Sequence, residues 1–116
     1  KVLPHFQGRF DGVAIRVPTP TGSISDVTAL LGKDVTAEEI NSAIKTAADG
    51  PLNGIVDYST DPRVLKDIVG NPHSGMFDSR MSNTMGNKAK VFVWYDNECG
   101  HCYRLVDVVE IMAKSL

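Results

Sequence analysis

The sequence has little of what defines several large classes of protein. Only 12 of its 116 residues are Lys or Arg, they are scattered, and the formal net charge is -2. Nucleic-acid and membrane-surface binding need clustered positive charge, so neither partner is expected. No apolar run approaches the roughly 20 residues that cross a bilayer, and no signal peptide is evident. Two cysteines are too few for a disulfide scaffold, which favours a reducing cytoplasm.

Motifs that would make the chain an enzyme by itself are also missing. No two of the ten glycines are spaced as Gly-x-Gly, which excludes a dinucleotide fingerprint and a P-loop. No Ser, His and Asp combination indicates a triad, and no pair of carboxylates stands at a convincing site. Structural zinc sites usually draw on a second spaced pair of ligands, which is absent, so no metal site is predicted. The sequence therefore assigns no catalytic residue.

Apolar alternation predicts two strands in the first quarter of the chain. The first covers residues 10–17 and the second about 24–31. Residues 18–22 between them are dense in turn formers. The two strands are therefore expected to pair with each other in antiparallel fashion.

The clearest single element is a helix that follows. Thr36 and Glu39 have the spacing of a capping box, in which each side chain satisfies a backbone N–H of the first turn. Gly50 and Pro51 end the helix. An apolar stripe at helical spacing comprises Ile40, Ala43, Ile44, Ala47 and Ala48.

The remaining sequence predicts three strands and a closing helix. The strands cover 54–58, about 74–79 and 90–95, with an irregular stretch from Asp61 and a polar loop at 82–87. The resulting order, β-β-α-β-β-β-α, predicts an α+β domain with a mostly antiparallel sheet and helices packed on one face. The closing helix spans about 100–114, and its expected buried side comprises Leu105, Val108, Val109, Met112 and Leu116.

A Cys-x-x-Cys motif, Cys99-Gly100-His101-Cys102, stands at the start of the closing helix. Thiol redox proteins use this placement because a helix N-terminus favours a thiolate. A thioredoxin-like domain needs a hairpin and a further helix after the motif, and the closing helix occupies the remaining residues. The alternative is a pair of thiols packed at a strand-to-helix junction.

Two further places are candidate binding sites. Arg16 ends the first predicted strand beside a tight turn, where its planar guanidinium suits a phosphate group. The alternative is an ordinary surface arginine. Asp96 and Asn97 follow a buried strand and suit a turn or a helix cap. The amide of Asn97 equally offers a donor and an acceptor to a ligand carboxamide.

Several of these segments, taken in order, resemble the phosphorylating glyceraldehyde-3-phosphate dehydrogenases over essentially the whole chain. Residues 12–20, Gly-Val-Ala-Ile-Arg-Val-Pro-Thr-Pro, resemble the family's phosphate-binding strand. Residues 50–55 resemble its Gly-Pro-Leu-x-Gly-Ile signature. Residues 94–98, Trp-Tyr-Asp-Asn-Glu, followed by Gly100 and by residues 104–107, resemble the signature near the family's C-terminus. The opening residues 1–4 resemble the segment that follows a substrate loop.

The resemblance implies NAD-dependent oxidation and phosphorylation of an aldehyde phosphate, with NADP not excluded. Arg16 would bind a phosphate group of the substrate or inorganic phosphate. Asn97 would hold the nicotinamide carboxamide, with Tyr95 nearby. In the family the nucleophilic Cys, the His base and the Rossmann domain precede this part of the chain. Residues 1–116 are therefore expected to be the C-terminal part of a catalytic domain, inactive alone and belonging to a homotetramer.

The resemblance leaves the substrate and some site residues open. A relative that acts on erythrose 4-phosphate shares most of these motifs, so the aldehyde is not fixed. The family usually has an aromatic residue in place of Cys99, Tyr in place of His101 and a small polar residue in place of Cys102. A thiol redox module and a non-catalytic interaction module remain the alternatives from other functional classes.

Overall fold

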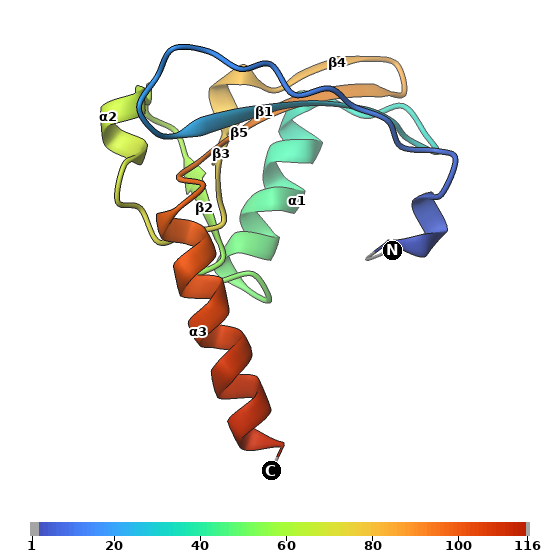
Figure 1. The fold of residues 1–116 in the computed structure, drawn as a ribbon. Coiled ribbons are helices and arrows are strands. Elements are labelled where there is room, and N and C mark those ends of the chain that lie inside the picture. The colour runs from blue at the N-terminus through green and yellow to red at the C-terminus, as the bar shows by residue number, and fades with distance from the viewer. Residues whose placement is uncertain (1–2, 116) are drawn as a thin grey trace.

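A five-stranded sheet carries the fold in the computed structural model, which describes residues 3–115. Its strands are β1 (Ser23–Leu30), β2 (Val56–Ser59), β3 (Gly75–Asp78), β4 (Asn83–Met85) and β5 (Lys88–Tyr95). Strand β5 is the spine: β1 pairs antiparallel along its whole length on one side, and β3 and β4 pair antiparallel with it on the other. Strand β2 runs parallel to β3 and completes the order β1-β5-β3-β2 (Figure 1).

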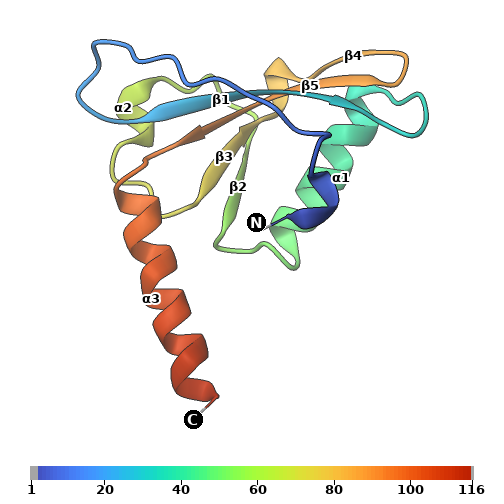
Figure 2. The ribbon, with the colours of Figure 1, turned by 45° about the vertical axis from the view of Figure 1, so that its right-hand side comes forward.

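Three α-helices connect or follow the strands, together with 3-10 turns at Pro4–Phe6 and Ser79–Met81. The helices are α1 (Ala37–Asp49), α2 (Leu65–Ile68) and α3 (Cys99–Lys114). Helix α1 packs against β2, whereas α3 leaves the end of β5 and projects away from the sheet (Figures 1 and 2). The chain that precedes β1, drawn in blue, runs back along β1 before it turns into that strand.

The core lies around β3, which is buried over its four residues because β2 and β5 flank it. Phe77, Ile68 and Met76 are its largest fully buried side chains. The ring of Tyr58 stacks on that of Phe77 with 5.7 Å between centroids. Burial of a side chain such as Phe77 stabilises the fold by about 1.5–3 kcal/mol. This core holds the C-terminal half of β5 in place.

Most of the predicted elements are confirmed. The α+β class, the mostly antiparallel sheet and the strands predicted at 24–31, 54–58, 74–79 and 90–95 agree with the structure to within two residues at each end. The capping box of α1 is present: the Thr36 N–H donates to Glu39 Oε2 at 2.8 Å, and the Glu39 N–H donates to Thr36 Oγ1 at 3.2 Å.

The predicted strand at residues 10–17 is wrong. This segment joins no ladder among the described residues, and Phe10, Val13 and Ile15 are 81%, 91% and 82% exposed. The expected partner, β1, pairs with β5 instead. Alternation of apolar residues specifies a face that suits burial, but it does not by itself form a ladder: β1 ends the strand order, and residues 10–17 do not pair with its outer edge.

Two short elements lie where irregular chain was predicted. The stretch after Asp61 contains α2, and the loop at 82–87 contains β4. Strand β4 forms a hairpin with β5 through Gly86 and Asn87, and Gly86 has a φ of 58°. A two-residue turn with a left-handed glycine is a hairpin signal, which the polar composition of this segment concealed.

The predicted buried side of the closing helix is also wrong. Leu105, Val108, Val109 and Met112 are between 51% and 64% exposed, and Leu116 lies outside the described residues. Helix α3 runs away from the sheet from its first turn onward (Figure 2). The apolar pattern is therefore real, but the described part of the chain provides nothing to cover it.

Candidate functional site

A pocket of about 340 Å³ opens where the turn before β1 meets the end of β5. Arg16, Tyr95 and Asn97 all line it, although Arg16 is far from the other two in the sequence. The β1–β5 ladder explains this proximity, because Ser23 at the start of β1 lies opposite Tyr95 at the end of β5. The structure thus brings together the three site residues that the sequence predicted.

Arg16 reaches this pocket from extended chain rather than from a strand. It is exposed, and within the described residues it takes part in no ion pair and no side-chain hydrogen bond. Its planar guanidinium therefore keeps its N–H donors available to a ligand. An arginine at the rim of a pocket suits an anion with several oxygens, such as a phosphate group.

Asn97 and Tyr95 form the opposite wall. The Ser23 hydroxyl donates to Asn97 Oδ1 at 3.4 Å, a long hydrogen bond that orients an otherwise exposed side chain. This contact occupies one lone pair of the Asn97 amide and leaves its NH₂ group for a ligand. Tyr95 is half-buried and lines a second, smaller pocket as well.

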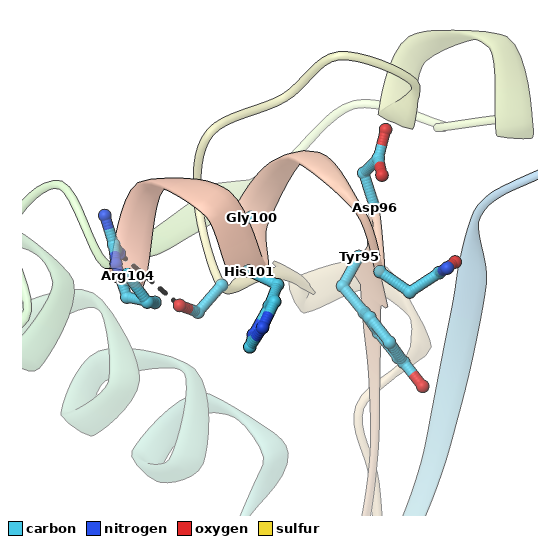
Figure 3. Close-up of a pocket in the computed structure, with 7 residues that line it drawn as sticks. Tyr95, Asp96, Gly100, His101 and Arg104 are labelled. Atoms are coloured by element: carbon cyan, nitrogen blue, oxygen red, sulfur yellow. Dashed lines mark hydrogen bonds between the residues drawn. The ribbon is translucent and has the colours of Figure 1, made fainter. Parts of the chain in front are cut away.

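The second pocket, of about 280 Å³, lies beside the first turn of α3 (Figure 3). His101 is exposed and lies between Arg104 and Tyr95 in Figure 3. The Arg104 guanidinium donates to Ser74 Oγ at 3.4 Å and to the Gly54 carbonyl at 3.2 Å, and it forms an ion pair with Asp107 at 2.8 Å. Because these partners engage it, Arg104 ties α3 to neighbouring loops rather than serving as a free cation.

Asp96 fixes the junction between β5 and α3. Asp96 is 5% exposed, and its carboxylate accepts backbone N–H bonds from Gly70, Glu98 and Cys99, each at 2.9 Å. The N–H of Gly70, followed by those of Cys99 and Glu98, lowers the pKa of Asp96 below its usual value. In Figure 3 this carboxylate points away from Tyr95 and His101. Asp96 lines the second pocket, but its carboxylate is engaged by the N–H groups of Glu98 and Cys99 at the start of α3, which agrees with the capping interpretation from the sequence.

Close packing also explains the glycine at position 100. A Cβ there would lie 2.7 Å from the carbonyl oxygen of His73. The first turn of α3 consequently rests directly on the loop that precedes β3. This contact fixes the start of α3 against that loop.

The two cysteines are both free, with Cys99 half-buried and Cys102 exposed. Within residues 3–115 no group of three or more His, Cys, Asp or Glu side chains is arranged to hold a metal ion. Among the same residues, no helix has both the length and the apolar character needed to cross a membrane.

Sequence reasoning missed two residues that shape the pockets. Ser23 orients Asn97, and Ser74 receives Arg104. Neither lies in a motif, and both are polar residues at strand starts, where serine is ordinary. Only the strand register, which the sequence leaves open, places them beside the predicted site.

The structure is an α+β domain that presents an arginine and an amide side chain at one pocket. Comparison with known families narrows this class. Residues 1–97 match the model of the glyceraldehyde 3-phosphate dehydrogenase C-terminal domain. The chain therefore belongs to the glyceraldehyde-3-phosphate dehydrogenase family and corresponds to its C-terminal domain.

Individual relatives agree with this assignment. The chain is 50% identical over 115 residues to a glyceraldehyde-3-phosphate dehydrogenase of Mycolicibacterium smegmatis and 51% identical over 115 residues to that of Mycobacterium avium. It is 45% identical over 112 residues to that of Kitasatospora aureofaciens. These matches cover 97–99% of this chain but only 34% of each relative. The chain thus spans about a third of the length of the curated relatives it matches.

Proposed function

We propose that this chain is the C-terminal part of the catalytic domain of an NAD-dependent glyceraldehyde-3-phosphate dehydrogenase. In this role it supplies a phosphate-binding residue, Arg16, and nicotinamide-binding residues, Asn97 and Tyr95. The observation that carries the proposal is the convergence of these three residues on one pocket. That convergence depends on the β1–β5 register and not on sequence proximity.

Asn97 has the chemistry to hold a nicotinamide carboxamide. Its side chain stands exposed at the pocket, and the Ser23 hydroxyl fixes its orientation through Oδ1. An amide pairs with another amide through one donor and one acceptor, and both kinds of atom are present in Asn97. The bound nicotinamide would accept the hydride removed from the aldehyde, while Tyr95 would form part of the wall beside it.

Arg16 would contribute by binding an anion and orienting it. A charge-assisted, two-pronged contact with phosphate oxygens combines attraction with a fixed geometry. Holding an attacking phosphate, or the phosphate group of the substrate, converts part of the encounter into an intramolecular step. Electrostatic help of this kind does not replace a covalent nucleophile. The isolated chain is therefore proposed to be inactive.

The remaining machinery is proposed to lie elsewhere in a longer polypeptide. A chain that covers 34% of its relatives leaves room for a nucleotide-binding domain, a nucleophilic cysteine and a general base. The names of these relatives favour glyceraldehyde 3-phosphate over erythrose 4-phosphate as the aldehyde. A cytoplasmic homotetramer is proposed on the basis of the family and of the two free thiols.

The test is steady-state kinetics on the intact enzyme with Arg16→Ala. Loss of a hydrogen bond to a charged group, about 1.5–3 kcal/mol, corresponds to roughly ten- to hundred-fold weaker use of phosphate or aldehyde. Arg9→Ala is the matched control, because Arg9 is also exposed in the segment before β1 but lines neither pocket. Arg16→Lys keeps the charge and should retain part of the activity. If Arg16→Ala and Arg9→Ala behave alike, Arg16 is an ordinary surface residue and the proposed site is wrong.

A further inference from the structure

Two free thiols stand one helical turn apart at the start of α3. Cys99 and Cys102 are at positions i and i+3, so their side chains lie on the same face of the helix. Cβ atoms at this spacing are about 5–6 Å apart, and a disulfide needs roughly 3.5–4.5 Å. A contraction of the first turn by about 1–2 Å therefore closes the bond. Because Cys102 is exposed, a soluble oxidant can reach it.

The backbone of Cys99 is coupled directly to the junction residue Asp96. The N–H of Cys99 donates to Asp96 Oδ1 at 2.9 Å, and the neighbouring N–H of Glu98 donates to the same oxygen. The N–H of Gly70 holds the other oxygen from outside the helix. Asn97 lies between Asp96 and these two donors in the chain. Movement of the Cys99 backbone is consequently passed to Asn97.

On the C-terminal side of Cys99, the first turn of α3 packs closely against the loop before β3. Gly100 rests so closely on the His73 carbonyl that an added Cβ would come within 2.7 Å of it. One turn further on, Arg104 is tied to Ser74 and to the Gly54 carbonyl. Contacts of Gly100 and Arg104 with these loop residues thus hold the first turns of α3 in place. A contraction between Cys99 and Cys102 is therefore taken up by residues 97–99, which lie between the fixed Asp96 and Gly100 and of which Asn97 and Glu98 are exposed.

We propose that Cys99 and Cys102 form a reversible disulfide, and that closing this bond displaces Asn97 and weakens binding of the nicotinamide group. The second half of the proposal rests on the proposed function, and the first half does not. With glutathione disulfide as the oxidant, its S–S bond breaks as the protein S–S bond forms. The two thiol protons and the two electrons removed from the cysteines end on two molecules of glutathione.

The disulfide is tested by mass spectrometry on the intact protein equilibrated with mixtures of reduced and oxidised glutathione. After free thiols are alkylated, trypsin cleavage after Lys90 and Arg104 releases residues 91–104, a peptide that contains both cysteines. As the mixture becomes more oxidising, the doubly alkylated peptide should give way to one that is two hydrogens lighter than the unmodified peptide. A peptide that stays doubly alkylated, or that only acquires glutathione, would overturn the proposal.

The coupling between the Cys99–Cys102 disulfide and Asn97 is tested by two independent measurements. Oxidation should weaken NAD affinity by about two- to tenfold, the loss of roughly one hydrogen bond. It should also speed hydrogen exchange of the backbone amides of Glu98 and Cys99, without any ligand present. The double variant Cys99→Ser, Cys102→Ser should show neither change. If wild type and variant agree in both measurements, the coupling does not exist; if NAD fails to bind in either redox state, the proposed function fails and the exchange data alone decide the coupling.

Discussion

Helices α1 and α3 both carry apolar residues at helical spacing, but these residues lie in different environments. In α1, Ala48 is 6% exposed, and Ile40, Ile44 and Ala47 are half-buried on the side that faces the sheet. In α3, only Gly100 is buried, and the apolar residues from Leu105 to Met112 are more than half exposed. Packing holds α1 along its length, whereas α3 is held at its N-terminal end, residues 96–104, which is called its root.

The two helices also begin in different ways. The α1 cap is local and exposed, since Thr36 and Glu39 exchange bonds with each other. The α3 cap is buried and long-range, because Asp96 also accepts the N–H of Gly70 from another segment. A helix without a packed face thus depends on its first turn for its position. Tyr95 and Asn97 flank that turn, so the candidate site lies at the rooted end of α3.

The largest expected effect comes from removing the root of α3. Asp96→Ala leaves three backbone N–H groups without their charged acceptor in a buried place. Each such loss is costly, and we expect the free energy of unfolding to fall by about 2–4 kcal/mol in total. Urea unfolding of the chain followed by circular dichroism measures this change. A decrease below about 0.5 kcal/mol would show that the root is not what holds α3.

Acid unfolding provides a control for the same prediction. The N–H bonds, that of Gly70 first, hold the pKa of Asp96 below its ordinary value of 3.8 in the folded state. A depressed folded pKa means that the stabilisation is complete above the unfolded pKa and is lost as the pH falls through the folded pKa. Wild type should therefore lose stability below about pH 4 more steeply than Asp96→Asn. Parallel acid profiles would contradict this account of the carboxylate.

The next effect compares one apolar residue from each helix. Ile44→Ala removes a half-buried side chain from the face of α1 toward the sheet, and we expect a loss of about 1–2 kcal/mol. Val109→Ala removes a side chain of α3 that is 64% exposed, and the change should stay within about 0.5 kcal/mol. Alanine also has the higher helix propensity, which offsets the small loss of contact in α3. Both values come from the same urea titration of the 116-residue chain.

Equal losses for these two variants would contradict the comparison. They would mean that α3 is covered in solution even when no other polypeptide is present. Concentration dependence of the Val109→Ala effect would then distinguish self-association from a different fold of the single chain. An effect that grows with protein concentration indicates association.

The contrast between the helices also explains which parts of the fold the sequence predicts. Elements whose signals are local are predicted well, as the capping box of α1 and the β-branched run of β5 show. The segment 10–17 and the apolar face of α3 have equally regular patterns, and both are exposed. The spacing of apolar residues indicates that a face suits burial, but which element covers that face depends on the tertiary structure. Short elements such as β4 and α2 are missed for the opposite reason, because few residues give a weak periodic signal.

The candidate site shows the same division. Resemblance to a family pointed to Arg16, Tyr95 and Asn97 one by one, and the structure brings them to one pocket. Ser23 was not predicted, because its role follows from the register that places it opposite Tyr95. The sequence predicts a turn or a cap at Asp96, and the structure adds its burial and the long-range N–H donor from Gly70. The residue types can be read directly from the sequence, whereas their interaction partners depend on the fold.

The smallest effect concerns the exposed cap of α1 and completes the comparison with Asp96. Thr36→Ala removes the acceptor for the Glu39 N–H, and we expect a loss of about 1 kcal/mol in the free energy of unfolding. The loss is smaller than at Asp96 because water can replace an exposed partner, and because packing against β2 still holds α1. Thr36→Ser keeps the hydroxyl and should restore nearly all of the stability. If alanine and serine are equivalent at position 36, the hydroxyl does not contribute and packing alone specifies where α1 begins. A loss as large as that of Asp96→Ala would instead show that both helices depend equally on their first turns, which would remove the distinction between a packed helix and a rooted one.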